Sequence, residues 1–283
     1  MNRTRRRAVA LLIVLATFVV TGVAFAQRRF GGGFSFREGS FPYVAAPEQM
    51  PDAGFVVCRL AYRQIRREES GIGWQTDYPY AEINLTTRLS ELTKTRVMRD
   101  ESDEPRHYAV QPLDNALFSC PFLVASDAGT LGFTDAEADR MREYFMKGGF
   151  LWADDFWGEA AWESFQREMG KVLPPSEFPV EEIDIADPML HEQFELTKIP
   201  QITNIQFWRR SGGRETSERG EETRIPHLNV IRDAHGRVMV VATHNTDVAD
   251  SWEREGEDPE FFYQFSPDGY ALGIDVLLYA MTH

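Results

Sequence analysis

The chain has 283 residues, of which 43% are hydrophobic and 26% charged, and its net charge is −14 at pH 7. This composition is typical of a globular protein and excludes a largely disordered, collagen-like or coiled-coil chain. The negative charge argues against nucleic-acid binding through a basic face and against binding to anionic membrane surfaces.

The first 26 residues have the pattern of a secretory signal peptide. Four arginines between positions 3 and 7 precede an apolar run at 8–23, and Ala-Phe-Ala at 24–26 supplies the small residues of a cleavage site. We expect cleavage before Gln27 and a periplasmic or secreted protein. The alternative is an uncleaved N-terminal membrane anchor, but an apolar run of about 16 residues is short for a span of ~20. Any membrane contact would then come only through this segment.

Residues 27–53 form a tether rich in Gly, Pro and aromatic residues, without a hydrophobic period. This favours a disordered spacer over docking of its aromatic side chains on a partner or on the domain. The globular domain is expected at 54–283.

Cys58 and Cys120 both lie in apolar, strand-like runs. An oxidising compartment would permit a disulfide, but buried free thiols are the preferred interpretation.

Strand-like and helix-like patterns then alternate. Strands are predicted at 55–60, 121–125 and 150–153, and helices at 81–92, 134–147 and 160–172. Thr134 and Glu137 form a capping box at the start of the second helix, and a Gly-Gly pair ends it. This rhythm predicts an α/β fold, a three-layer sandwich around a mostly parallel sheet.

The C-terminal third has a different pattern. Residues 209–224 are rich in Gly, Ser and charge and are predicted to be a mobile surface loop. Residues 228–243 predict a β-hairpin around a turn at 233–236. An acidic stretch follows at 250–260, and an amphipathic helix at 269–282 closes the chain.

Polar residues follow three of the predicted strands, at 74–79, 154–158 and 244–247. In open α/β sheets, ligands bind beyond the carboxyl ends of the strands. Each of these segments carries carboxylates, and a tryptophan lies in or near it. We therefore predict a pocket formed by Asp77, Tyr78, Asp154, Asp155, Trp157, His244, Asn245 and Asp247.

The adjacent carboxylates Asp154 and Asp155 are the most specific element, and they have functional and structural interpretations. They could bind a cation through oxygen ligands, or one could act as a general base with its pKa raised by the other. Alternatively, Asp155 caps the following helix and Asp154 pairs with an arginine. Asp77 has an equally good interpretation as a turn residue that hydrogen-bonds local backbone.

The other candidates also have structural interpretations. His244 could be a general base or a ligand, but a single histidine is more often structural. Asn245 and Asp247 would serve equally well in turn capping. Three tryptophans could stack on a sugar face or belong to the core: Trp74, Trp157 and Trp252. No zinc-type spacing, phosphate-binding glycine loop or serine nucleophile elbow occurs, so we expect neither a metal nor a cofactor.

The blocks at 74–79, 121–123, 148–158, 245–247 and 273–274 together resemble a bacterial family, domain of unknown function 4159. The resemblance covers nearly all of 54–283. It implies a flavodoxin-like scaffold of the class I glutamine amidotransferase-like superfamily, which includes trehalose-utilisation-like proteins. In amidotransferases a cysteine occupies the strand-to-helix turn that holds Asp154 and Asp155 here. The resemblance therefore argues against glutamine hydrolysis.

Three functions are compatible with these patterns. The leading hypothesis is binding of a small polar, carbohydrate-like ligand in the cell envelope. The second is a hydrolase in which Asp154 or Asp155 is the base, with or without a divalent cation. The third is a structural partner within an envelope complex, contacting other proteins through the tether and the acidic stretch. Family members often occur beside membrane proteins with von Willebrand-type domains and a chaperone-like ATPase, which favours an envelope assembly.

Overall fold

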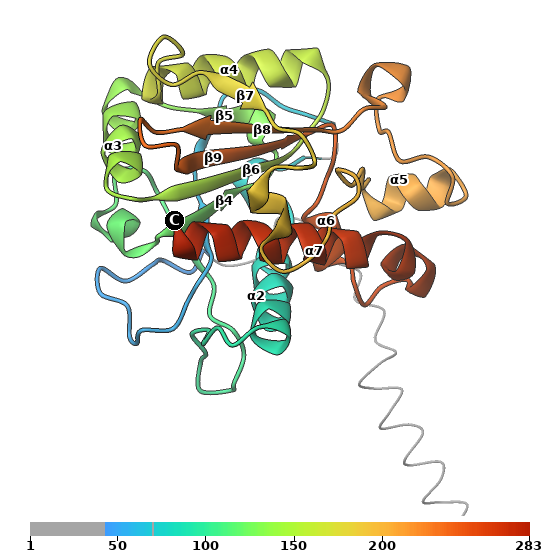
Figure 1. Cartoon of the computed structure of the whole chain (residues 1–283), viewed down its shortest axis with the longest axis horizontal. Helices are drawn as coiled ribbons and strands as arrows, with labels where there is room; N and C mark the ends of the chain where they lie inside the picture. The colour runs from blue at the N-terminus through green and yellow to red at the C-terminus, as the bar shows by residue number, and fades with distance from the viewer. Residues whose placement is uncertain (1–42, 70) are drawn as a thin grey trace, which may run out of the picture. The chain divides into compact units, whose positions relative to one another are not determined.

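The computed structural model describes residues 43–69 and 71–283, so the predicted signal segment and the first part of the tether lie outside the described residues. Seven strands form the central sheet in the order β3-β1-β4-β6-β9-β8-β7, and β2 pairs with β5 separately (Figure 1). The strands are β1 (Cys58–Leu60), β2 (Arg63–Gln64), β3 (Tyr108–Val110), β4 (Phe122–Ala125), β5 (Leu131–Gly132), β6 (Phe150–Phe156), β7 (Val180–Glu182), β8 (His227–Arg232) and β9 (Val238–His244).

The central sheet is mostly parallel. Strands β3, β1, β4, β6 and β9 run parallel to one another, whereas β8 is antiparallel to β9 and β7 antiparallel to β8. Strand β4 is buried along its whole length. Its side chains alternate between the two apolar cores, with Leu123 in one and Val124 in the other. A strand covered on both faces needs this continuous apolar run, so the predicted α/β class with a mostly parallel sheet is confirmed.

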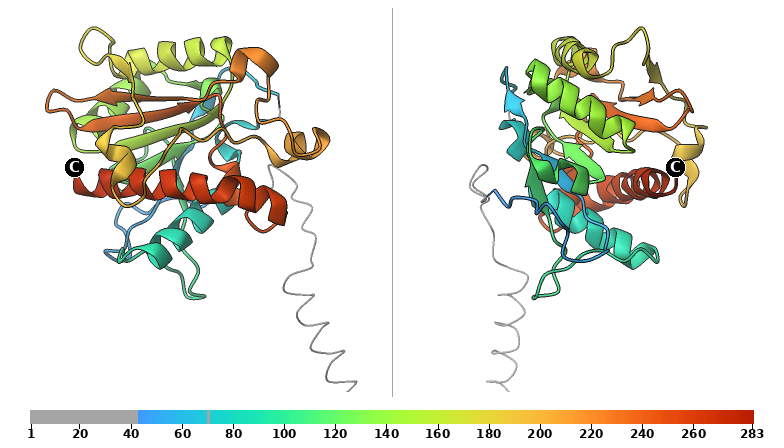
Figure 2. Two further views of the ribbon diagram at one scale, coloured as in Figure 1. Left: turned by 45° about the vertical axis from the view of Figure 1, so that its right-hand side comes forward. Right: turned by 90° about the vertical axis from the view of Figure 1, so that its left-hand side faces the viewer.

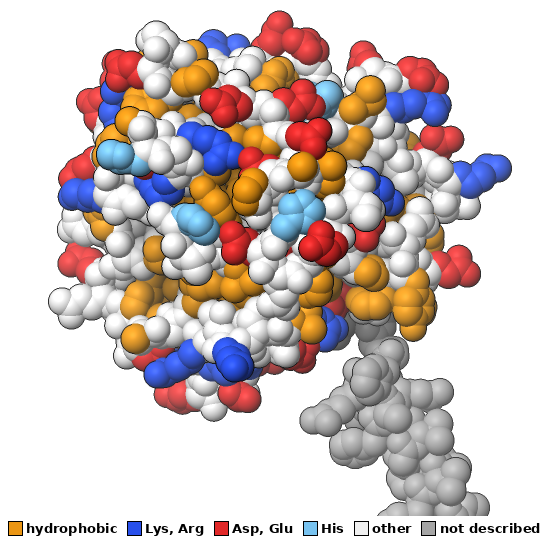
Figure 3. Space-filling model, viewed as in Figure 1, with side chains coloured by type: hydrophobic (Ala, Val, Ile, Leu, Met, Phe, Trp, Pro, Cys, Tyr) orange, Lys and Arg blue, Asp and Glu red, His pale blue; other side chains and the backbone are white. Residues whose placement is uncertain are grey.

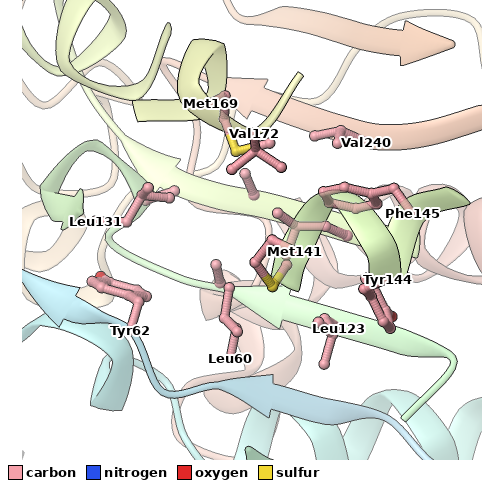
Figure 4. Packing of buried hydrophobic residues seen from close by; sticks show 14 of the residues in the cluster. Leu60, Tyr62, Leu123, Leu131, Met141, Tyr144, Phe145, Met169, Val172 and Val240 are labelled. Carbon is pink, nitrogen blue, oxygen red and sulfur yellow. The ribbon is translucent and has the colours of Figure 1, made fainter. Parts of the chain in front are cut away.

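Helices cover both faces of the sheet. They are α2 (Tyr80–Leu92), α3 (Asp135–Met146), α4 (Glu159–Val172), α5 (Ile205–Arg210), α6 (Asp250–Glu253) and α7 (Pro259–Thr282). Helices α3 and α4 lie on one face, and α2 and α7 on the other (Figure 2). Met141 of α3 and Met169 of α4 pack with Leu60 and Leu123 of the sheet in the first core (Figure 4).

The start of α3 follows the predicted capping box. The Thr134 side chain accepts from the amide of Glu137, and the Glu137 side chain accepts from the amide of Thr134. The helix buries Ala138 and Met141, spaced one turn apart, against the sheet. No helix within the described ranges is both long enough and apolar enough to cross a bilayer.

The cysteines are not free thiols. Cys58 and Cys120 form a disulfide, with Cα atoms 5.8 Å apart. Cys58 lies in β1, and Cys120 lies two residues before the neighbouring strand β4. The expectation of free thiols was wrong because the adjacency of β1 and β4, which are 62 residues apart along the chain, is a property of the sheet order.

The described part of the tether packs on the domain and does not act as a spacer. Ala45 forms a parallel bridge with Ala109 of the edge strand β3. Val44 and Met50 pack against the first core, and the Tyr43 ring meets that of Trp74 edge-on with centroids 5.8 Å apart. An edge strand has unpaired backbone N–H and C=O groups. A segment can therefore pair with it through backbone hydrogen bonds even when the sequence of that segment has no hydrophobic period.

Two C-terminal segments also differ from expectation. The predicted surface loop at 209–224 begins inside α5 and contains Thr223, which is fully buried. Helix α7 starts at Pro259, ten residues before its predicted start at 269. Asp258 caps this helix by accepting from the amide of Glu260, proline is favourable at the first helical position, and Phe261 is buried.

Candidate functional site

The turns beyond four neighbouring strands of the sheet carry polar residues in the left-handed conformation. Asp77 lies in the loop between β1 and α2, Asp127 follows β4, Asp155 lies at the end of β6, and Asn245 follows β9. Their φ angles are 65°, 51°, 53° and 61°. Aspartate and asparagine are the non-glycine residues that tolerate this region best. From β1 the chain continues to β3 on one side of the sheet and then to β4 on the other side of β1. In such sheets, ligands bind at the point where the strand order switches direction, which here lies between β1 and β4.

Three carboxylates predicted from the sequence lie close together. Asp77, Asp155 and Asp247 each contribute an oxygen to a group in which all atoms lie within 4.8 Å of one another. Asp77 also belongs to a second such group, with Asp250 and Glu253. We call these five residues the carboxylate cluster. The loop before α2, the end of β6, the loop after β9 and the short helix α6 that follows it supply its members.

Most members of the carboxylate cluster are buried. Asp77 is 8% exposed, Asp247 2% and Asp250 fully buried, whereas Asp155 is half-buried. The Ser126 hydroxyl donates to Asp77 Oδ2 at 2.7 Å, and the Trp157 indole Nε1 donates to Asp155 Oδ1 at 3.2 Å.

Backbone amides fix two further members. The amide of Asp250 donates to Asp247 Oδ1 at 3.0 Å, and that of Ile205 donates to Asp250 Oδ2 at 2.7 Å. These bonds orient the carboxylates but do not neutralise their charge.

Counter-charge is unevenly distributed over the cluster. The guanidinium of Arg254 lies 3.4 Å from Asp250 and 2.7 Å from Glu253. By contrast, among residues 43–69 and 71–283 no Lys, Arg or His forms an ion pair with Asp155 or Asp247. Figure 3 shows acidic and basic side chains interspersed over one surface of the molecule. Asp155 and Asp247, by contrast, have no such basic neighbour in an ion pair within the described part of the chain.

Burial and mutual repulsion raise the pKa values of the cluster. Burial, followed by the charges of Asp77 and Glu218, raises the pKa of Asp155 well above its ordinary value. Burial and then Asp155 act in the same way on the pKa of Asp247. Burial raises the pKa of Asp250 to about 7, although Arg254 opposes the shift. A buried carboxylate without a counter-charge must take up a proton or a cation.

Asp154, the other half of the predicted pair, lies outside the carboxylate cluster. It accepts hydrogen bonds from the Thr243 hydroxyl and from the amide of Ala249, the latter at 2.8 Å. Burial raises its pKa to about 7. The alternative in which Asp155 caps the next helix is wrong, because α4 is capped by Gly158 without a side-chain bond. Asp154 connects β9 to the segment before α6, and within 43–69 and 71–283 it forms no ion pair with an arginine.

His244 and Asn245 have structural contacts. The His244 ring stacks on Trp162, with centroids 5.1 Å apart, and its Nε2 is 3.1 Å from the Gly158 carbonyl. Burial lowers the pKa of His244 to about 4. Asn245 Oδ1 accepts from the Gly158 amide at 2.9 Å. The contacts of His244 in the described chain include no carboxylate of the cluster.

The aromatic candidates do not form an open stacking platform. Trp252 is 1% exposed and packs edge-on against Trp152 in the second core. Tyr78 is 2% exposed and packs against Trp74, with ring centroids 5.7 Å apart. Trp157 is 5% exposed and contacts the cluster through Asp155. The aromatic side chains therefore form walls and core.

Several functional candidates escaped the sequence analysis. They are Arg59, Asp127, Glu218, Asp250 and Glu253. Glu218 lies in the segment predicted as a loop, and Asp127 follows a strand end without a second acidic neighbour. One sequence signal could have grouped Asp250 with Glu253: the two residues are spaced one helical turn apart, which places them on the same face of a helix.

The carboxylate cluster can therefore bind a cation through oxygen ligands or share protons among its members. Comparison with known proteins adds a family to this geometry. No curated protein matches the chain significantly. Residues 58–281 match the family described as Domain of unknown function (DUF4159), and because the match covers most of the chain, the protein belongs to this family.

Proposed function

We propose that the carboxylate cluster binds a divalent cation and, together with it, a small polar ligand such as a carbohydrate. One observation carries the proposal: oxygens of Asp77, Asp155 and Asp247, which come from three separate segments of the chain, lie within 4.8 Å of one another. Hard cations such as Ca²⁺, Mn²⁺ and Mg²⁺ take oxygen ligands, chiefly carboxylates. A cation would supply the positive charge that Asp155 and Asp247 lack among the described residues.

The half-buried Asp155 supports the ligand part of the proposal. It is the most accessible of the three carboxylates, and the Trp157 indole holds one of its oxygens at 3.2 Å. A hydroxyl-bearing ligand could complete the coordination of the cation from the Asp155 side. Stacking of a sugar on Trp252 is not part of this proposal, because that side chain is buried.

Titration with Mn²⁺, Ca²⁺ and Mg²⁺ tests the proposal. We expect saturable binding by the wild type, at least tenfold weaker binding by Asp155→Asn and Asp247→Asn, and unchanged binding by Asp139→Asn. Asp139 is an exposed residue of α3, so its variant makes the same chemical change away from the cluster. Absence of saturable binding by the wild type at millimolar cation would overturn the proposal. A glycan array with and without the cation then tests the polar ligand.

A hydrolase is the second candidate, and the position of Asp155 favours it. A half-buried carboxylate with a raised pKa is suited to act as a general base. A broad panel of glycosides, esters and amides, with and without Mn²⁺, should show turnover that is lost in Asp155→Asn. Lack of turnover on every substrate, together with normal cation binding, would leave binding as the function.

We also propose the finer relationship to the class I glutamine amidotransferase-like superfamily, with its flavodoxin-like topology and a C-terminal β-hairpin. The left-handed conformation of Asp155, with φ 53° at the end of β6 just before α4, supports it. The two cysteines of the sequence are bonded to each other, which supports the absence of a thiolate nucleophile.

Export to the envelope, and protein partners there, are further parts of the proposal. The signal-like segment and the Cys58–Cys120 disulfide support an oxidising compartment. N-terminal sequencing of the protein from the periplasmic fraction should begin at Gln27. Recovery of the whole chain in the cytoplasm would contradict export, and recovery of the whole chain in membranes would favour the anchored alternative.

A further inference from the structure

A fully buried arginine lies beneath the turn that carries Asp77. Arg59 is the middle residue of β1, and its side chain is 0% exposed. Its Nε donates to Glu82 Oε1 of α2 at 2.5 Å. Its Nη1 donates to the Thr76 carbonyl at 2.7 Å and, more weakly, to the Trp74 carbonyl at 3.5 Å. One guanidinium therefore connects β1, α2 and the backbone immediately before Asp77.

Asp77 is the member of the carboxylate cluster that most needs such support. It belongs to both carboxylate groups, so a shift of its side chain would disturb both. Its backbone has φ 65°, a left-handed conformation that aspartate tolerates better than most residues but that still carries a free-energy cost. Ser126 holds the carboxylate at 2.7 Å, and Arg59 holds the preceding carbonyls. The turn is thus fixed at two points.

Stability alone does not account for the Arg59–Glu82 pair. A buried ion pair is often no more stabilising than apolar side chains of similar volume. Arg59 Nη2 and Glu82 Oε2 are both buried without a hydrogen-bond partner among the described residues. Such orphaned polar atoms carry a free-energy cost.

We infer that Arg59 is a positioning residue, which sets the location of the Asp77 carboxylate in the cation site. This inference rests on the proposed function. Residues that orient metal ligands without touching the metal commonly change metal affinity 10–100-fold when they are replaced.

The test compares the affinity for Mn²⁺ with the stability of the full chain. In the double variant Arg59→Met with Glu82→Leu, both buried charges are removed and most of the volume is kept. We expect it to unfold at a urea midpoint close to that of the wild type, while its dissociation constant for Mn²⁺ rises about 10–100-fold. Arg59→Lys should give an intermediate loss, because an ammonium group cannot reproduce the planar fork of a guanidinium.

Arg142→Met is the matched control. Arg142 also donates to a backbone carbonyl, that of Val172 at 2.7 Å, but it lies on α3. We expect its Mn²⁺ affinity to be that of the wild type.

The outcomes separate the two proposals. Wild-type affinity in both the double variant and Arg59→Lys would overturn the inference and leave the cation site intact. No Mn²⁺ binding by the wild type would overturn the proposed function, and the inference with it. If the double variant does not fold, Arg59→Lys decides: weaker Mn²⁺ binding at an unchanged urea midpoint supports positioning. Undiminished binding, or a loss of affinity that only accompanies a loss of stability, refutes it.

Discussion

Raising the pH in the presence of a chelator should destabilise the folded protein. Burial and the neighbouring charges of Asp155 and Asp77 raise the pKa of Asp247 well above its ordinary value. In the unfolded chain the same group ionises near pH 3.9. The folded state therefore retains a proton that the unfolded state has lost, and stability falls as pH rises from the unfolded pKa towards the folded one.

The size of this effect follows from the number of retained protons. Each proton held only by the folded state lowers the free energy of unfolding by about 1.4 kcal/mol per pH unit. Asp247 is 2% exposed, so solvent does little to weaken the shift. One proton that the folded state retains over about two pH units corresponds to about 3 kcal/mol. For a domain of this size, that is a fall in Tm of roughly 6–12 °C.

A pH series that starts at about pH 7.5 avoids an opposing group. Burial lowers the pKa of His244 to about 4, so this side chain adds stability as pH rises towards the ordinary histidine pKa of about 6.5. The histidine of the unfolded chain is still half protonated at that pH, so the contribution of His244 fades over the next pH unit and is nearly gone above about pH 7.5.

Thermal unfolding followed by circular dichroism at several pH values, with EDTA and then with excess Ca²⁺, measures the effect. We expect Tm to fall with pH in EDTA and to recover at about pH 8.5 when Ca²⁺ is added, because the cation replaces the retained protons. Asp247→Asn should flatten the EDTA profile. A Tm that stays constant or rises in EDTA as the pH increases from about 7.5 would refute the reasoning.

Three further predictions concern stability. Replacing Cys58 and Cys120 together by alanine should lower the unfolding free energy by about 4 kcal/mol, since the bridge closes a loop of 62 residues; an unchanged urea midpoint would contradict this. Asp154→Ala removes the acceptor of the Ala249 amide and leaves the Thr243 hydroxyl with only the Ala153 carbonyl at 3.2 Å. This should cost roughly 1–3 kcal/mol, whereas wild-type stability would show that the amide finds another acceptor. Thr134→Ala removes the α3 cap and should cost about 1 kcal/mol by urea unfolding; equal stability would show that the cap contributes nothing.

Local patterns predict most of the regular structure, because hydrophobic periodicity records which side of an element is buried. The apolar run at 121–125 corresponds to β4, and the capping box at Thr134 corresponds to the start of α3. Helix α7 was predicted too short because its first turns are stabilised by Asp258 and by burial of Phe261 within an otherwise acidic region. The acidic residues around Phe261 mask its burial in a pattern of hydrophobic residues.

The placement of acidic residues after strands also predicts part of the carboxylate cluster. Asp77, Asp155 and Asp247 meet as the parallel-sheet rule requires. Asp154 and His244 do not join them. Neighbouring residues in a strand point to opposite faces, and these two side chains find partners in Thr243 and Trp162.

Local patterns were enough to predict the alternation of strands and helices and the carboxylates at strand ends, since both are properties of short segments. The position of β1 beside β4 emerges only in the folded chain. That adjacency joins Cys58 to Cys120 and brings Asp77 to Ser126. It also buries Arg59 beneath the Asp77 turn. Strand order depends on packing between segments far apart along the chain, and no local period encodes it.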